Sequence, residues 1–540
     1  MGLSFHHTRP VLLSLLAFAF LAIVHTWPLA AAPSHWARAD AGDGALNIWA
    51  VSWVGRALTH HPSRLFEANI FYPERLTLAY SEAMVVQGLF AAPILALGGS
   101  AVLAYNVSLL AGFALTGWAF CLLVRRWTGS WSAGYVAGSL AAFNAYSLVH
   151  LTHLQFLHVE FFALMLYALD RLIVDGRAKY AWALAAGFAL QGLTSVYLMV
   201  FSVWSLLFAV LSRVGEWWRR RLAFAARLAG AGGVAILLLA PYLAGYAAVR
   251  AQMGFARGAD EAEAATWINY LSTGARLHYD SWSKPFVEAG TSATFPGIVA
   301  LALIALAVSD RDVVRDPRFR MCVVVAGGCA AVSMLPLLPF YRQLHDAVPL
   351  FQAVRVLAHL GQVVLLMVAV LGGFGLAVLQ RTWRHTGSWP AVAVAVTVLV
   401  NAEALRAPMG YVWFEGVPPI YDVLAKDPTA VVVELPFPIP QQWFLNTPYM
   451  VNSTRHWRPL VNGYSGFRPA SYYKAYDIVR AFPADESLIA LHELGVTHVV
   501  IHQRALSNGA DHSYDPFERV ASLKMIARDD DVLIYRLLER

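Results

Sequence analysis

The chain has little charge. Only 14% of its 540 residues are Asp, Glu, Lys or Arg, whereas 58% are hydrophobic, and the mean hydropathy is +0.53. Soluble domains usually carry about 25% charged residues, and a single core cannot bury this much apolar surface. The composition therefore excludes an ordinary soluble protein and indicates a polytopic membrane protein.

Cysteine is also scarce, since Cys121, Cys322 and Cys329 are the only three and all fall in apolar stretches. Neither a disulfide framework nor a zinc-binding spacing can be formed from them. The Gly-x-Ser-x-Gly, phosphate-loop, dinucleotide-binding and His-Glu-x-x-His patterns are missing as well. These absences argue against the common serine hydrolases, nucleotide-binding enzymes and zinc peptidases.

Apolar windows predict about eleven transmembrane helices. The window 10–31 precedes a small-residue stretch like that of a signal peptide, but its roughly 20 apolar residues exceed a usual signal core, so we expect a retained helix. The predicted spans are 10–31, 101–124, 130–148, 153–174, 179–195, 196–212, 222–248, 293–309, 320–339, 353–379 and 389–405.

Arginine-rich connections predict the orientation through the positive-inside rule. A cytoplasmic N-terminus is expected. The segment 83–98 is interpreted as a short re-entrant or interfacial helix, because a full span there would move every later loop to the opposite side of the membrane. The net charge of +6 implies contact with anionic lipid head groups, and nucleic acid is not an expected partner. The predicted cytoplasmic connections lie around 125–126, 171–179, 213–227, 311–320 and 381–384, and the predicted outward ones are 32–82, 149–153, 249–292, 340–352 and everything after about 406.

The composition changes near residue 406. We therefore divide the chain into a transmembrane domain, 1–405, and a small soluble α/β domain, 406–540, on the outer side. Strands are predicted at 429–435, 496–501 and 531–535, and a helix at 484–494 ends at Gly495, a plausible C-terminal cap.

The outward loop 32–82 carries the first candidate site. Asp40 and Asp43 follow directly on the first span, and the apolar residues between 46 and 58 recur at helical spacing with polar residues between them. That spacing suits an amphipathic helix in the membrane interface. Asp43 is interpreted either as a catalytic or substrate-binding carboxylate or as the N-cap of the helix beginning near Ala45.

A second candidate group lies near the outward turn 149–153. His150, His153 and His158 surround that turn, and Glu160 is expected about two turns into the following helix, where an ionisable group marks a site hypothesis. The group could bind a divalent metal or a phosphate, although its spacing matches no zinc motif. Interfacial hydrogen bonding is the alternative.

Arg355 and His359 are expected to share a helix face at i and i+4. Arg355 could neutralise a departing phosphate, and its alternative is snorkelling to lipid phosphate. The weaker candidates border outward loops and are Glu82, Arg276, Lys284 and Glu288.

Several short motifs together resemble the GT-C superfamily of polyprenyl-phosphate-dependent glycosyltransferases, and above all a set of bacterial members with little characterisation. The resemblance covers most of residues 10–405 and extends into the C-terminal domain. The motifs are Gly42 to Trp49, Asn69 to Pro73, Ala104 to Asn106, His150 to His153, Thr194 to Tyr197, Phe351 to Arg355, Glu434 to Pro436 and Leu494 to Val500.

The resemblance implies a GT-C-like α-helical fold of about 11–12 transmembrane helices and an extracytoplasmic C-terminal domain. It also implies an inverting transfer of a hexose or pentose from a polyprenyl-phosphate donor, in the bacterial inner membrane, to a glycan, lipid or protein acceptor on the periplasmic or outer face. Asp43 would be the base, because it lies within Gly-Asp-Gly, and Asp40 an auxiliary carboxylate. Membrane lipids would be further partners.

The expected substrate-binding residues are Arg355, His359, Glu82, His150, His153, Glu160, Asn47 and Trp49. No cofactor is certain. A divalent Mg, Mn or Zn ion held by Asp40, Asp43 and His153 is one option, and the lipid-linked sugar is a substrate.

Two other functions fit the same composition. A transporter or flippase of lipid-linked glycans would have paired halves of inverted topology, which the sequence lacks, although 192–197 reads as one broken helix. A non-catalytic envelope scaffold would use the acidic loop only structurally.

Overall fold

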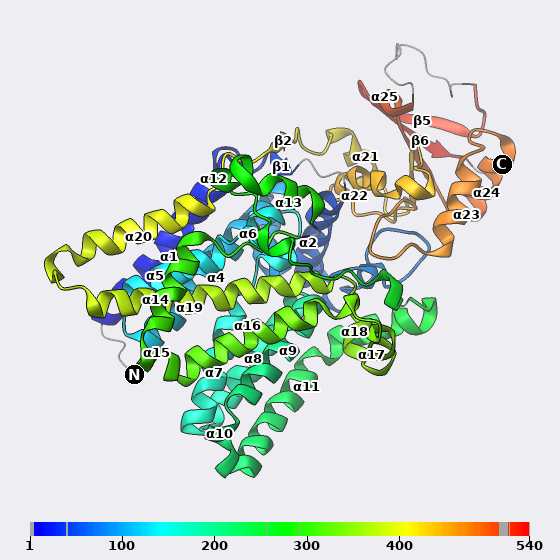
Figure 1. The fold of residues 1–540 in the computed structure, drawn as a ribbon. Helices are drawn as coiled ribbons and strands as arrows, with labels where there is room; N and C mark the ends of the chain where they lie inside the picture. Colours follow the sequence, from blue (N-terminus) through cyan, green and yellow to red (C-terminus); the bar gives the residue numbers. More distant parts are fainter. Residues whose placement is uncertain are drawn as a thin grey trace. The chain divides into compact units, whose positions relative to one another are not determined.

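A computed structural model describes residues 5–38, 42–255, 257–290, 292–506, 517 and 519–538, without the side chains of 5–8 and 38 (Figure 1). The chain divides into two compact units. The first unit comprises 1–32, 107–243 and 256–409, and the second comprises 33–106, 244–255 and 410–540. Asp40 lies outside the described residues.

The first unit is helical. Its helices are α1 (Phe5–His25), most of α4 (Ala101–Thr128), α5 (Trp131–Ala142), α6 (Ala145–Val149), α7 (Glu160–Asp175), α8 (Ala178–Thr194), α9 (Val196–Ser212), α10 (Val214–Trp217), most of α11 (Arg221–Met253), α12 (Arg276–His278), α13 (Lys284–Ala289), α14 (Ile298–Ser309), α15 (Arg311–Arg315), α16 (Pro317–Ser333), α17 (Tyr341–Ala347), α18 (Pro349–Gln352), α19 (Gly361–Thr382) and α20 (Trp389–Ala404).

The second unit joins helices to two small sheets. Its elements are β1 (Trp36–Arg38), α2 (Asp43–His60), the short helix Pro62–Arg64, α3 (Val85–Ala96), β2 (Tyr411–Trp413), α21 (Asp422–Lys426), β3 (Val432–Leu435), α22 (Thr447–Ser453), α23 (Ala470–Val479), α24 (Asp485–Glu493), β4 (His498–His502), α25 (Gln503–Leu506), β5 (Leu523–Arg528) and β6 (Val532–Leu537).

The helices agree with the predicted membrane architecture, since each of the eleven predicted spans contains a helix. Among the described residues, five helical stretches are long and apolar enough to cross a membrane: Ala101–Thr128, Val214–Met253, Pro317–Leu337, Leu357–Thr382 and Thr386–Ala404. The predicted short helix in 83–98 is α3. Its 12 residues extend only about 18 Å, less than the hydrocarbon thickness of about 30 Å.

Helix α19 is the centre of the first unit. It packs against α5, α14 and α16, and 83% of its most apolar window is buried, compared with 11% for α20. Glycine allows the close crossing, because a Cβ on Gly375 would lie 1.8 Å from the carbonyl oxygen of Leu303 in α14. Small residues at helix crossings are the usual means of packing in membranes, where apolar burial alone does not hold helices together.

Polar contacts join the predicted cytoplasmic connections at one end of the first unit. Asp170 is fully buried and accepts hydrogen bonds from Arg213 at 2.5 Å and from Arg318 at 3.4 Å. Arg381 donates to Asp310 at 2.9 Å. The ends of α7, α9, α14, α16 and α19 therefore share one side, as the predicted alternation of loops requires.

The C-terminal part of the second unit contains a four-stranded sheet in the order β3-β4-β6-β5. β3 and β4 are parallel and the other pairs are antiparallel. The three predicted strands and the helix before Gly495 are confirmed, and Gly495 has the left-handed φ of +89° that a helix-ending glycine favours. β5 was not predicted. The second unit also includes 33–106, so residues far apart in sequence fold together, and the division at residue 405 stays a prediction.

Three local predictions are wrong. Helix α2 is not amphipathic as predicted, because Asn47 and Ser52 are buried, although Thr59 and His60 at its end are exposed. Glu160 is the first residue of α7 rather than two turns inside it, since a turn and the short helix Leu154–Phe156 come first. The segment before α19 is not one long helix: the isolated bridge from Glu263 to Val356 interrupts it.

Candidate functional site

Asp43 begins helix α2 in the second unit. The N-cap is Gly42, so the structure does not place Asp43 in the capping position. Its carboxylate is half-buried, and Oδ1 accepts a hydrogen bond of 3.2 Å from the hydroxyl of Tyr464. A carboxylate in the first turn is favoured by the helix dipole, and it can accept a proton from a hydroxyl that reaches it.

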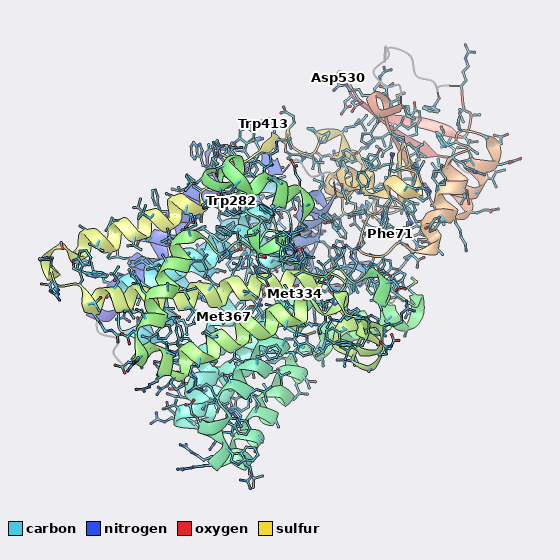
Figure 2. The ribbon with its side chains drawn as sticks, viewed as in Figure 1. Phe71, Trp282, Met334, Met367, Trp413 and Asp530 are labelled. Carbon is cyan, nitrogen blue, oxygen red and sulfur yellow. The ribbon has the colours of Figure 1, made fainter. Side chains whose placement is uncertain are left out.

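Aromatic residues surround the hydroxyl that contacts Asp43. The ring of Tyr464 lies edge-on to that of Trp443, with centroids 4.9 Å apart, and the guanidinium of Arg468 lies 5.1 Å above Trp443. Phe71, marked in Figure 2, is buried beside Trp443. Asp43 therefore lies next to a rigid aromatic wall that also carries a positive charge.

Asn47 and Trp49 lie deeper in the same unit. Trp49 is 1% exposed, and its indole N–H donates to Oδ1 of Asn69 at 3.1 Å. Asn69 in turn donates to the hydroxyl of Ser453 and to the carbonyl oxygen of Arg458. Two motifs of the loop, Gly42 to Trp49 and Asn69 to Pro73, thus meet through a buried hydrogen bond, and this contact gives Trp49 a structural role.

Glu82 is half-buried between two backbone groups fixed by Tyr246. The hydroxyl of Tyr246 accepts a hydrogen bond from the N–H of Ala83 and donates to the carbonyl oxygen of Ser81, each at 3.0 Å. The backbone on both sides of Glu82 is therefore ordered, and its proposed contact with substrate stays a prediction.

Three predicted histidines meet in the first unit. The ring centroid of His150 lies 5.6 Å from that of His153 and 5.5 Å from that of His359. Tyr146 stacks on His150 at 4.2 Å, and Phe156 lies 4.8 Å from His359. The structure therefore unites residues that are more than 200 positions apart in sequence.

The protonation of His150 follows from its surroundings. Burial lowers the pKa of His150 to about 4, and His153 lowers it further. The Nδ1 atom of His150 must donate, because its partner at 2.9 Å is the carbonyl oxygen of Tyr146. At neutral pH His150 is thus a neutral imidazole whose Nε2 can accept a hydrogen bond from a sugar hydroxyl.

His158 and Glu160 form a separate buried pair. His158 Nδ1 lies 3.1 Å from Glu160 Oε1, and His158 Nε2 lies 2.9 Å from the carbonyl oxygen of Ser108. Thr116 contacts the second carboxylate oxygen at 3.5 Å. Each polar group of the pair has a partner within the unit, as buried ionisable groups in membrane proteins require.

Arg355 does not share a helix face with His359. Its side chain is 45% exposed and lies 3.5 Å from the carboxylate of Glu263, whereas His359 is buried within the histidine cluster. The backbone N–H of Arg355 donates to the hydroxyl of Tyr197, a residue that also packs edge-on against His359. Arg355 is thus fixed by its backbone at the border of the cluster.

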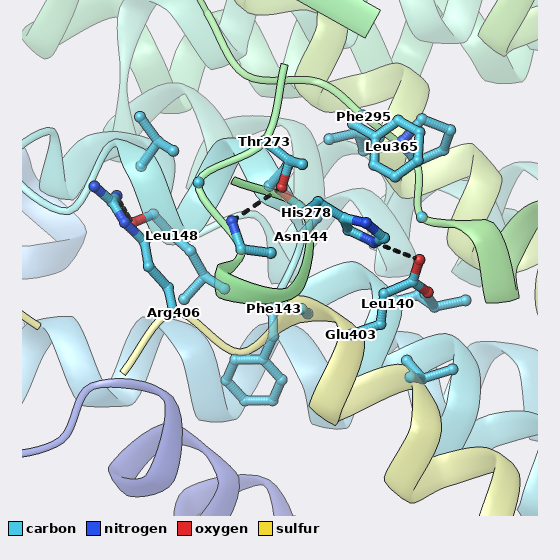
Figure 3. Close-up of a pocket in the computed structure, with 18 of the residues that line it drawn as sticks. Leu140, Phe143, Asn144, Leu148, Thr273, His278, Phe295, Leu365, Glu403 and Arg406 are labelled. Carbon is cyan, nitrogen blue, oxygen red and sulfur yellow. Dashed lines mark hydrogen bonds and ion pairs between the residues drawn. The ribbon is translucent and has the colours of Figure 1, made fainter. Parts of the chain in front are cut away.

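A small cavity of about 40 Å³ in the first unit contains His278 and Glu403 (Figure 3). His278 Nε2 lies 3.0 Å from Glu403, and Trp282 donates to His278 Nδ1. Glu403 also accepts the N–H groups of Ile298 and Val299, the first residues of α14. This carboxylate therefore stabilises a helix N-terminus, and the cavity is too small for a sugar.

The C-terminal sheet carries another buried acid, Glu434. One of its carboxylate oxygens accepts hydrogen bonds from Tyr421 at 2.7 Å and from His502 at 2.6 Å. Burial acts to lower the pKa of His502, but the hydrogen bond to Glu434 and the charges of Glu434, Asp531 and Asp529 outweigh it and raise the pKa above its usual value.

The metal prediction is not tested. Within the part of the chain that the structure describes, no group of three or more His, Cys, Asp or Glu side chains is arranged to hold a metal ion. The proposed ligand Asp40 is not among those residues.

Comparisons with known proteins agree with this architecture. No protein-family model matches the sequence, and no curated protein does. Among solved structures, the arabinofuranosyltransferase AftD from Mycobacteria aligns over 98% of this chain with a TM-score of 0.59 at 14% identity. The chain has a GT-C-like fold. It spans 40% of the AftD chain, so the GT-C-like fold is what this likeness establishes.

Two further solved structures match this chain with lower TM-scores. ArnT from Cupriavidus metallidurans, bound to undecaprenyl phosphate, matches with a TM-score of 0.47 at 11% identity, covering 99% of this chain and 98% of its own. The oligosaccharyltransferase AglB from Archaeoglobus fulgidus matches with a TM-score of 0.45 at 12% identity, covering 93% of this chain and 70% of its own.

Several residues of these clusters were not predicted from the sequence. Tyr464, Tyr146 and Phe156 are aromatic residues without a distinctive spacing, so only the fold reveals what they contact. Glu434 did have a signal, because a carboxylate within Val-Val-Val-Glu-Leu interrupts an apolar strand. Such a residue needs a buried partner.

Proposed function

We propose that this membrane protein transfers a sugar from a polyprenyl-phosphate donor to an acceptor hydroxyl on the outer face of the bacterial inner membrane. The observation that carries the proposal is Asp43: within a GT-C-like fold it begins α2, is half-buried and contacts the Tyr464 hydroxyl. A carboxylate so placed suits a general base.

The reaction is a single displacement with inversion. As the acceptor oxygen bonds to the anomeric carbon, its proton passes to the carboxylate of Asp43. The bond from the anomeric carbon to the phosphate oxygen breaks, and its electron pair leaves with the polyprenyl phosphate. The hydrogen bond from Tyr464 to Oδ1 makes that tyrosine a positioning residue for the base.

Arg355 and the three histidines are proposed as contacts of the donor. Arg355 is exposed enough to exchange Glu263 for a phosphate, whose charge grows as the bond breaks. His150, His153 and His359 supply ring nitrogens for sugar hydroxyls. Asp40 is proposed as an auxiliary carboxylate, and the lipid tail would lie between the spans.

The test replaces Asp43 by asparagine, which keeps the shape and removes the base. Vesicles containing the variant should transfer radiolabelled sugar from polyprenyl-phosphate donors about 10²- to 10⁴-fold more slowly than the wild type. Asp477→Asn is the matched control, because its carboxylate is 66% exposed in the same unit. Unchanged transfer by a folded Asp43→Asn variant, or a requirement for a nucleotide sugar, would sink the proposal.

A further inference from the structure

We propose that a groove in the second unit, around Arg56 and Trp457, binds an acidic oligosaccharide as part of the acceptor. This inference rests on the proposed function, since it names the chemical class of the acceptor. The groove is separate from Asp43 and uses none of the residues that the sequence predicted for the site.

Two cavities form the groove. Their volumes are about 430 Å³ and about 320 Å³, within the range of small-ligand sites. Both are lined by Arg56, His60 and Trp457, so they meet along the last turns of α2. Trp53, Arg64 and Tyr72 are among the other residues that line the larger cavity.

The tryptophan in the wall is held in a costly conformation. Trp457 has a φ of +56°, in the left-handed region that bulky residues avoid. Its ring lies 5.8 Å from that of Trp53 and 5.4 Å from the guanidinium of Arg56. Strain of this kind is typical of binding sites, and a half-buried indole offers an apolar face to the C–H groups of a sugar ring.

The charge of the groove calls for an anion. No carboxylate lies within 4.0 Å of the side-chain nitrogens of Arg56 or Arg64 in the described parts of the chain. Burial lowers the pKa of Arg56, and the neighbouring Arg458 lowers it further. A cation in this position is stabilised by any anion that binds beside it.

The other charged groups that line the groove are largely compensated. Glu67 is paired with Arg75 at 2.8 Å, and Arg455 is paired with Asp422 at 2.7 Å. Glu74 remains as a carboxylate that can accept hydrogen bonds from sugar hydroxyls. Aromatic faces, hydrogen-bonding groups and an excess of arginine together fit a saccharide chain that carries carboxylates or phosphates.

The distance from Asp43 sets the kind of acceptor. Arg56 follows Asp43 on the same helix, about 20 Å further along at 1.5 Å per residue. A single sugar cannot reach both residues. The groove would therefore hold a glycan a few units away from the end that is extended.

The experiment measures binding without turnover. The full chain in nanodiscs of zwitterionic phosphatidylcholine is titrated calorimetrically with tetragalacturonate, with the neutral maltotetraose and with inorganic phosphate. Tetragalacturonate should bind, and Arg56→Gln, Arg64→Gln and Trp457→Leu should each weaken it about tenfold or more. Arg64 lies on the surface, so its variant tests the site without disturbing the core.

The controls distinguish this inference from the proposed function. Arg219→Gln removes an exposed arginine of the first unit and should leave binding unchanged. Asp43→Asn should lose transfer and keep binding. Equal affinity for maltotetraose, equal affinity for inorganic phosphate, or full binding by both arginine variants would each overturn the acidic-oligosaccharide site. Binding by an Asp43→Asn variant that still transfers sugar would overturn only the role of Asp43.

Discussion

Arg213 in the first unit and Arg56 in the second unit have opposite surroundings. In the first unit Arg213 is 2% exposed and is satisfied by Asp170, and His278 is satisfied by Glu403. In the second unit Arg56 is half-buried beside a cavity, and its guanidinium lies 5.4 Å from the ring centre of Trp457. A charge that the fold already compensates belongs to the architecture, whereas a charge facing an open cavity is available to a ligand.

The environment explains the difference. Helices of the first unit cross an apolar medium, where an uncompensated charge costs several kcal/mol, so partners are built in. The second unit contains the acidic loop and the C-terminal sheet, which carry enough polar surface to leave a cation partly hydrated. Substitutions at matched positions test this contrast.

The largest expected effect is at Asp170. Asp170→Ala removes the fully buried carboxylate that pairs with Arg213 and Arg318, and leaves Arg213 with the partly exposed Glu216. We expect a loss of about 3 kcal/mol in the free energy of unfolding, measured by denaturant titration in detergent. Asp175→Ala is the control, because its pair with Arg171 is partly exposed and should cost at most about 1 kcal/mol. Similar losses for both variants would show that burial of the ion pair does not set its contribution to stability.

His502→Gln should have the next largest effect on the free energy of unfolding, and this effect should depend on pH. The pKa of His502 is raised in the folded protein, so the ion pair with Glu434 contributes fully below the usual histidine pKa and is lost as the pH rises through the folded value. At pH 6 the variant should lose about 1.5–3 kcal/mol, the range for a hydrogen bond to a charged group.

The measurement compares unfolding of the wild type and of His502→Gln from pH 6 to pH 9. Their difference should shrink with rising pH. A difference that stays constant across this range would mean that His502 contributes by packing against Tyr449 alone.

Trp49→Phe should have a smaller effect. It keeps the buried ring and removes the N–H that donates to Asn69, so we expect a loss of about 1 kcal/mol in unfolding free energy. If the rate of sugar transfer falls strongly while the free energy of unfolding changes by only about 1 kcal/mol, Trp49 contacts substrate as the sequence predicts. Trp267→Phe, at a ring that is 65% exposed, serves as the control.

The smallest effect on stability is expected at Arg56, where no ion pair is lost. Arg56→Gln should change the unfolding free energy by no more than about 0.5 kcal/mol, as for substitutions away from packed or paired groups. A loss as large as that of Asp170→Ala would show that Arg56 is a structural charge, and the two units would then follow the same rule.

Local patterns predicted much of the fold. Apolar windows located a helix in each expected span, and short apolar runs located β3, β4 and β6. Where the prediction failed, at the start of α7 and before α19, tertiary contacts replaced helix with turns: Glu263 bridges to Val356 there. β5 was missed because its alternating Leu, Lys and Met residues form no continuous apolar run.

The candidate site was only partly predictable. Asp43 and the three histidines were identified by residue type and position relative to the spans. Their partners were not, because Tyr464 lies 421 residues from Asp43 and His359 lies more than 200 from His150. Spacing along the chain carries no information about such contacts.

The sequence by itself determined that this is a membrane protein and where most of its helices and strands lie, because hydropathy and helical periodicity are local properties that extend over a few turns. Only the tertiary structure decided which charges are compensated. That decision depends on packing between distant segments, and it separates Arg213, held by Asp170, from Arg56, which faces a cavity.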